Sequence, residues 1–94
     1  MAKDITDLTI AYEEDGVVVV EELDKVILSK GAWSTILFRY RQWDAAKNEY
    51  GPERYSLRRY RKMKDEYRQQ SKFTISSKEQ AQKLIDALRK WVES

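Results

Sequence analysis

The chain has 94 residues, a formal net charge of +2, and neither cysteine nor histidine. A chain of this length forms one domain that buries only about 60 to 65% of its unfolded surface, so it folds alone or gains core by pairing with a second copy. Without cysteine there is no disulfide framework or thiolate metal site, and without histidine the commonest general base and metal ligand is missing. We therefore expect a small globular protein without a cofactor.

The charges are unevenly distributed along the chain. Residues 1–37 carry three basic and eight acidic side chains, whereas residues 38–72 carry eleven basic and five acidic ones. Seven of those eleven are arginines, whose planar guanidinium groups meet phosphate oxygens in pairs and also stack on bases. The basic middle of the chain therefore favours an anionic partner.

The sequence pattern over the first 28 residues predicts secondary structure only weakly. Residues 1–16 alternate only loosely and end in an acidic run, which predicts a flexible acidic lead-in to a single domain over residues 17–94. An alternative is that this lead-in folds over the basic face as an internal competitor for the anion. The β-branched run 17–20 resumes at 26–28, which predicts one bulged strand or a short hairpin.

The clearest strand covers residues 33–43. Its even positions 36, 38 and 40 are apolar and its odd positions 39 and 41 are basic, which places two guanidinium groups on the face opposite the apolar set. The alternating residues are Ile36, Phe38 and Tyr40 against Arg39 and Arg41. A polar loop is expected over residues 44–52, because it contains the pair Gly51-Pro52.

Two further strands follow, over residues 54–63 and 67–75, joined by a turn at residues 64–66. In the strand over residues 67–75, Phe73 and Ile75 share a face with Tyr67, which leaves Arg68 and Lys72 on the opposite face. In the first, the consecutive charges Arg58-Arg59 predict a bulge or an exposed edge.

The period then changes to that of a helix. Ser76 and Glu79 fit a capping box with Ser76 as the N-cap, and an apolar stripe follows at helical spacing: Ala81, Leu84, Ile85, Leu88, Trp91 and Val92. The predicted fold is α+β, an antiparallel meander of about four strands followed by one amphipathic helix. Such a helix covers one face of the sheet and leaves the other for water or a partner.

Three strand segments combine rings with cations, as a surface for single-stranded nucleic acid requires: a positive track for the backbone and flat rings on which bases stack. The candidate binding residues are Arg39, Arg41, Trp43, Arg58, Arg59, Tyr60, Arg61, Arg68 and Lys72. Pairing of the last two strands places Arg59 or Arg61 near Arg68, a repulsion that an anionic partner relieves. The alternative is a merely solvated face, because edge strands also use charge to block aggregation.

The remaining rings have other expected places. Core positions are predicted for Phe38, Tyr40, Tyr55, Phe73 and Trp91, whereas Trp43 and Tyr60 fit either the core or a stacked base. The acidic residues lack the spacing of a calcium loop, and the sequence has no glycine-rich phosphate cradle or nucleophile elbow. We therefore expect a binding protein, not an enzyme, and no metal site.

Four strands and a C-terminal helix with a basic, aromatic face resemble the single-stranded DNA-binding modules of the transcriptional coactivator PC4 and the related Whirly and Pur-α types. Residues 36–43, which end Arg-Tyr-Arg-Gln-Trp, are similar to the PC4 strand that carries a basic residue and ends in an aromatic pair. Residues 73–77, leading into Glu79 and the apolar stripe, are similar to its passage from last strand to helix. The Arg-rich hairpin over residues 54–72 is longer than the matching PC4 segment.

The resemblance implies binding of single-stranded DNA, or RNA, in transcription or replication, and a homodimer formed through the C-terminal helix. A rival hypothesis is a protein-interaction module whose basic sheet face binds an acidic partner. The longest apolar run is residues 17–20, and residues 1–10 lack a basic segment followed by an apolar one. We therefore expect a cytoplasmic protein with no membrane association.

Overall fold

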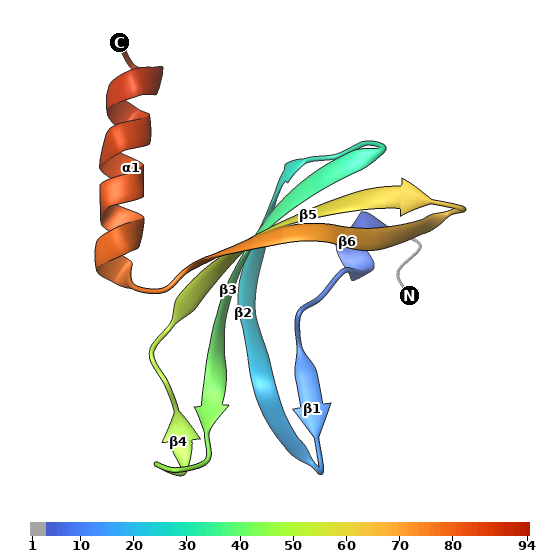
Figure 1. The fold of residues 1–94 in the computed structure, drawn as a ribbon, viewed down its shortest axis with the longest axis vertical. Coiled ribbons are helices and arrows are strands. Elements are labelled where there is room, and N and C mark those ends of the chain that lie inside the picture. The colour runs from blue at the N-terminus through green and yellow to red at the C-terminus, as the bar shows by residue number, and fades with distance from the viewer. Residues whose placement is uncertain (1–3) are drawn as a thin grey trace.

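The computed structural model describes residues 4–94 and consists of a curled antiparallel sheet followed by one helix (Figure 1). The elements are η1 (Ile5–Asp7), β1 (Tyr12–Glu14), β2 (Val17–Ser29), β3 (Trp33–Asp44), β4 (Glu49–Tyr50), β5 (Arg54–Met63), β6 (Glu66–Ile75) and α1 (Lys78–Val92). The strand order β1-β2-β3-β5-β6, with β4 beside β3, confirms the expected antiparallel meander and its C-terminal helix. The expected number of about four strands was too low.

The two additional strands have local causes. β1 pairs with β2 across a turn at Asp15 and Gly16, whose positive φ angles of 51° and 80° suit a tight hairpin. β4 lies in the stretch expected to be a loop, where its two residues pair with Trp43 and Asp44 at the end of β3. β2 is one bulged strand, with register shifts between Glu22 and Asp24 and between Ile27 and Ser29, as its interrupted β-branched runs predicted.

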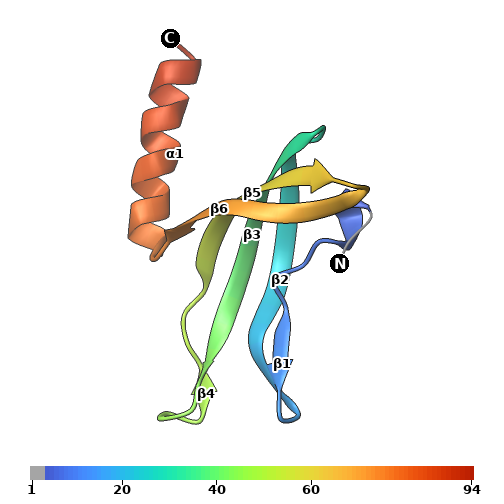
Figure 2. The same cartoon turned by 45° about the vertical axis from the view of Figure 1, so that its right-hand side comes forward.

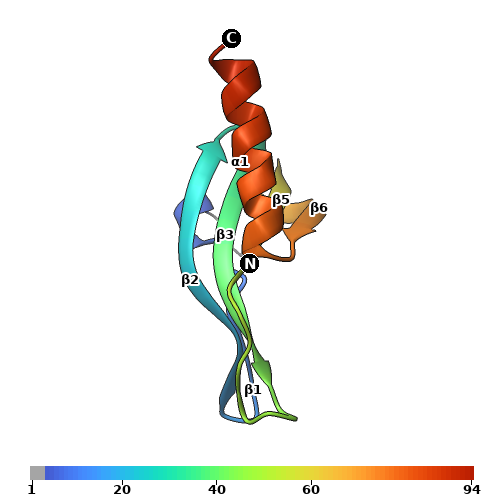
Figure 3. The ribbon, with the colours of Figure 1, turned by 90° about the vertical axis from the view of Figure 1, so that its left-hand side faces the viewer.

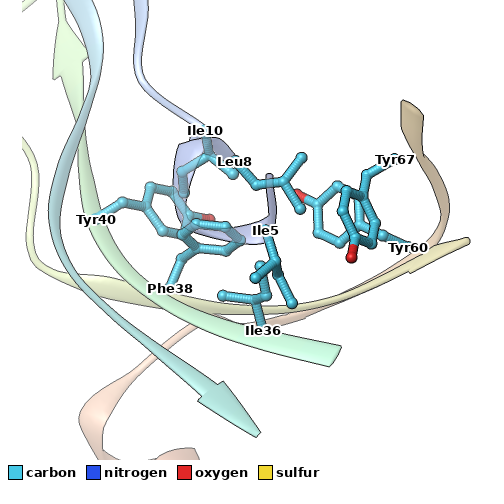
Figure 4. Packing of buried hydrophobic residues seen from close by; sticks show 8 residues of the cluster. All are labelled: Ile5, Leu8, Ile10, Ile36, Phe38, Tyr40, Tyr60 and Tyr67. Atoms are coloured by element: carbon cyan, nitrogen blue, oxygen red, sulfur yellow. The ribbon is translucent and has the colours of Figure 1, made fainter. Parts of the chain in front are cut away.

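The core lies on the concave side of the curled sheet, here called the inner face. The even positions of β3 point into it as predicted, and two tyrosines from β5 and β6 join them (Figure 4). The buried cluster consists of Ile36, Phe38, Tyr40, Tyr60 and Tyr67 together with Ile5, Leu8 and Ile10. Thus the apolar residues that cover the inner face come from the N-terminal segment.

This placement corrects the expectation of a loose lead-in over residues 1–16. Residues 4–11, here called the N-terminal strap, are held by polar contacts as well as by burial, and residues 1–3 lie outside the described part of the chain. The Nζ of Lys25 donates to the carbonyl oxygens of Thr6 and Leu8, both at 2.7 Å. A carboxylate oxygen of Glu22 accepts from the Thr9 hydroxyl at 2.7 Å. The strap completes the core because one curled sheet cannot bury its own inner face.

The helix begins one residue later than predicted. Ser77, not Ser76, is the N-cap, and its side chain accepts from the backbone N–H of Gln80 at 3.1 Å. The side chain of Gln80 in turn accepts from the backbone N–H of Ser76 at 2.9 Å. These reciprocal bonds fix the direction in which α1 leaves β6.

The helix does not cover a face of the sheet, contrary to expectation. It projects from the end of β6 on the side away from the N-terminal strap (Figures 1 and 2). Figure 3 shows that it extends beyond the sheet at the end opposite β1 and β4. None of its fifteen residues, all of which are described, is buried. Trp91, predicted to be core, is 68% exposed. Within residues 4–94 no helix is long and apolar enough to cross a lipid bilayer.

Candidate nucleic-acid interface

The face of the sheet opposite the strap, here called the outer face, carries the odd positions of β3. Side chains of directly paired residues in neighbouring strands share a face, so the registers assign the rest. Trp33 pairs with Arg61, and Thr35 with Arg59. Arg61 in turn pairs with Arg68 of β6. The outer face therefore holds most of the predicted basic residues.

One end of this face carries an exposed aromatic ring beside cations. The guanidinium carbons of Arg59 and Arg61 lie 4.3 and 5.2 Å from the centroid of the Trp33 ring, within the range of a cation–π contact. Trp33 remains 40% exposed. We call these residues with Arg68 the Trp33 cluster; it presents an indole and three guanidinium groups at the ends of β3, β5 and β6.

The charges of the Trp33 cluster are incompletely neutralised. Arg68 lies 3.8 Å from a carboxylate oxygen of Glu66, an exposed and weak ion pair. Among residues 4–94, neither Arg59 nor Arg61 forms an ion pair. Two guanidinium groups without a carboxylate partner thus lie over a partly exposed ring.

The other end of β3 carries a second aromatic group, which consists of Trp43, Tyr50 and Arg41 and is here called the Trp43 cluster. The rings of Trp43 and Tyr50 meet edge to face, with centroids 5.1 Å apart. The guanidinium of Arg41 lies 4.1 Å from the centroid of the Tyr50 ring. A hollow of about 410 Å³ beside Trp43 is lined by two basic residues, Lys47 and Arg54, and by the acidic Asp44. Trp33 and Trp43 are ten positions apart in β3, which corresponds to roughly 33 Å along the strand.

Charges at this second end are largely satisfied within the chain. Arg41 donates to both carboxylate oxygens of Glu21, at 3.1 and 3.2 Å. Arg39 contacts a carboxylate oxygen of Glu53 at 3.4 Å. A phosphate at this end would compete with internal carboxylates, so these two arginines offer less to a ligand than Arg59 and Arg61 do.

Between the two clusters the outer face is apolar. Leu37 pairs with Leu57 and with Val26, and Leu57 pairs with Phe73. Val26 and Phe73 are 53% and 59% exposed, so Phe73 is not the core residue that the sequence predicted. We call these four residues the apolar band. Shallow hollows of about 200 and 320 Å³ lie along it, one lined by Val26 and Leu37 and the other by Leu57 and Phe73.

Three predicted site residues lie on the inner face instead. Tyr60 is buried in the core, where desolvation raises the pKa of its hydroxyl, so it has no ring face free for a base. Arg58 donates to the Ser56 hydroxyl at 3.1 Å and to the Gln69 side chain at 2.9 Å. Lys72 pairs directly with Arg58 and shares its face.

The separation of Lys72 from Arg68 has a definite cause. Arg59 pairs with Ser71 and Tyr60 with Gln69, so Gln70 is an extra residue of β6 without a partner. A bulge of this kind reverses the alternation. As a result Tyr67 faces the core while Phe73 faces outward, and the predicted common face of these two rings is wrong. The predicted irregularity beside Arg58 and Arg59 exists, but it lies in the opposite strand.

One ring of each cluster, Trp33 and Tyr50, was not among the predicted site residues. Trp33 occupies an odd position of β3 like Arg39 and Arg41, so the alternation alone could have indicated its face. Tyr50 lies in a stretch that was expected to be a loop, and its pairing with Trp43 carried no sequence signal.

Comparison of the chain with protein-family models, with curated proteins and with solved structures gave no match.

Proposed function

We propose that the outer face binds single-stranded nucleic acid, as a transcription or replication accessory factor would. The resemblance to the PC4 group favours DNA over RNA. One observation carries the proposal: the Trp33 ring is 40% exposed, Arg59 and Arg61 lie over it, and neither cation has a carboxylate partner within residues 4–94. This combination supplies the two interactions that a single strand needs, stacking and phosphate contact.

The energies of these interactions support the choice of ligand. A base stacked on an aromatic side chain contributes about 1 to 3 kcal/mol, and a guanidinium beside the ring strengthens the site by a cation–π contribution. A phosphate placed between Arg61 and Arg68, which lie opposite each other, would replace their repulsion by two attractions. An acidic peptide would meet the same cations but would gain nothing from the indole.

The test uses the fluorescence of Trp33 alone. The substitutions Trp43→Phe and Trp91→Phe leave Trp33 as the single indole of the chain. We expect oligo-dT to quench its emission, because a stacked base contacts the ring, and polyglutamate of equal charge to leave the emission nearly unchanged. Equal responses to both polymers would support the acidic-partner hypothesis instead. Binding of oligo-dT with no change in Trp33 emission would place the strand elsewhere.

We also propose that the chain acts as a homodimer in which α1 contacts a second copy. The apolar stripe of α1 is uncovered: Leu84, Leu88 and Trp91 are 42%, 47% and 68% exposed. The apolar band on the outer face of the sheet is uncovered as well. Contiguous apolar surfaces of this kind are usually covered by a partner.

A second copy is the occupant that matches both surfaces. The two residues between β6 and α1 are tied to Gln80, so the direction of α1 away from its own sheet is fixed. In a two-fold dimer, the helix of each copy can lie on the apolar band of the other, and both surfaces are covered by one symmetric contact. The Trp33 and Trp43 clusters flank the band, so in this arrangement the strand would bind at the ends of the outer face.

A further inference from the structure

A basic hollow lies where two hairpin turns meet, next to the Trp33 cluster. It measures about 600 Å³ and is lined by Lys30, Gly31, Ala32, Lys62, Lys64, Asp65 and Tyr67. The backbone N–H of Lys62 donates to the carbonyl oxygen of Ala32 at 2.8 Å. This bond holds the turn between β2 and β3 beside the end of β5, so three lysines from separate turns and strands line one hollow.

The electrostatics of the hollow favour an anion. Three lysines face one lining carboxylate, Asp65, and within residues 4–94 none of the three forms an ion pair. The pKa of nearby Asp4 is lowered, first by hydrogen bonds from Thr6 and further by the charges of Lys30 and Lys62. The Asp4 carboxylate therefore offsets part of the charge of these two lysines.

Residues that line the hollow are direct neighbours in sequence of residues in the Trp33 cluster. Ala32 precedes Trp33 in the chain, and Lys62 follows Arg61, so each strand carries one residue into the cluster and the next into the hollow. Because side chains alternate across a strand, Arg61 points to the outer face and Lys62 to the inner one. A polyanion that leaves Trp33 and passes over the end of the sheet therefore meets Arg61 on the outer face and Lys62 on the inner one.

We propose that the hollow lined by Lys30, Lys62 and Lys64 binds a phosphate group of the strand whose base stacks on Trp33. This inference rests on the proposed function. The phosphate can come from the end of the strand or from the backbone next to the stacked base, and the chemistry of recognition is the same: ammonium groups opposite phosphate oxygens.

The test compares two double variants that lose the same charge. Lys30→Gln with Lys64→Gln removes two lysines from the hollow and keeps Lys62, which lies 5.7 Å from the centroid of the Tyr67 ring. Lys78→Gln with Lys90→Gln removes two exposed lysines from α1 as the control. Urea unfolding midpoints of both variants are compared with that of the native sequence, to verify that both are folded.

Binding of oligo-dT is measured as a function of salt, with a 5′-phosphate, a 3′-phosphate or neither. Loss of the one phosphate contact in the hollow should make the slope of log K against log salt shallower by roughly 0.7 in the hollow variant, and the control should keep the native slope. If a terminal phosphate is the ligand, one phosphorylated oligonucleotide binds the native protein more tightly and the hollow variant loses that advantage. If a backbone phosphate is the ligand, all three oligonucleotides show the same change in slope.

Two results would overturn the inference, and only one of them would also overturn the proposed function. Equal slopes for the hollow variant and the control, with binding by the native sequence intact, exclude the hollow and leave the proposed function standing. Absence of any oligonucleotide binding by the native sequence removes the proposed function and the inference with it.

Discussion

Arg61 and Arg68 lie directly opposite each other across β5 and β6, on the face of the sheet that also carries Trp33. Like charges in directly paired positions destabilise a sheet by roughly 0.2 to 1 kcal/mol, and Glu66 at 3.8 Å from Arg68 compensates only one of them. The pair is therefore a local cost to the unliganded fold. A ligand that bridges the two guanidinium groups converts that cost into binding.

Substitution of one member of this pair should separate stability from binding. We expect Arg61→Gln to leave the free energy of unfolding unchanged or to raise it by a few tenths of a kcal/mol, because it removes the repulsion. The same variant should bind oligo-dT more weakly, with a salt slope shallower by roughly 0.7. Arg39→Gln is the matched control, since Arg39 is already held by Glu53 and its loss should cost less affinity. Larger loss of binding in the control would contradict the assignment.

Removal of the Trp33 ring should weaken binding without unfolding the protein. Trp33→Ala is expected to cost about 1 to 3 kcal/mol of binding free energy for one stacked base, because the ring is exposed. Trp33→Phe should keep part of this energy, since a smaller ring still stacks. Isothermal titration with oligo-dT measures both variants. Equal affinities for the alanine variant and the native sequence would exclude Trp33 as a stacking residue.

Tyr60 should act through stability alone. Tyr60→Ala is expected to lose about 3 to 5 kcal/mol of unfolding free energy, as for other buried aromatic residues, whereas Tyr60→Phe should bind oligo-dT normally. Burial raises the pKa of Tyr60 above its ordinary 10.0. Its contribution to stability is therefore complete below pH 10.0 and falls as the pH rises through the higher pKa of the folded state. Urea unfolding above pH 10.0 should show a steeper fall for the native sequence than for Tyr60→Phe.

The N-terminal strap should behave as core and not as a displaceable cover. Leu8→Ala is expected to cost about 2 to 5 kcal/mol of unfolding free energy, since it opens a cavity among Phe38, Tyr40 and their neighbours. Glu13→Ala, a substitution at an exposed position of β1, should change stability little. Urea denaturation compares the two. If Leu8→Ala left stability unchanged and raised affinity for oligo-dT, the strap would be an internal competitor instead.

The helix stripe should control association. We expect Leu88→Lys to lower the mass in solution from dimer to monomer, because it places a charge in the apolar contact. Gln82→Lys adds the same charge to the polar side of α1 and should leave the dimer intact. Light scattering coupled to size exclusion gives both masses. A monomeric native protein, or two variants with equal mass, would contradict the proposed dimer.

Much of this fold follows from local patterns. The alternation Ile36-Phe38-Tyr40 against Arg39 and Arg41 predicted β3 and its two faces, and the change to helical spacing predicted α1. Features that depend on pairing between distant residues could not be predicted. The unpaired Gln70, which sends Lys72 to the inner face, depends on the register between β5 and β6. The contact of Trp33 with Arg59 depends on the register between β3 and β5 across a long connection.

The strap was missed for a different physical reason. Ile5, Leu8 and Ile10 are separated by polar residues at intervals of three and two, which matches neither a helix nor a strand for long. Its acidic side chains also favoured a solvated segment. Only the curvature of the sheet, which leaves an apolar inner face uncovered, explains why these three residues are buried.

The salt dependence of oligo-dT binding tests the central claim most directly. If about five phosphates are neutralised on the outer face and at its end, the slope of log K against log salt should be roughly −3.5. Trp33 emission should report the same transition at every salt concentration. A slope near zero, or binding that leaves Trp33 unaffected, would contradict the account of the outer face as a surface for single-stranded nucleic acid.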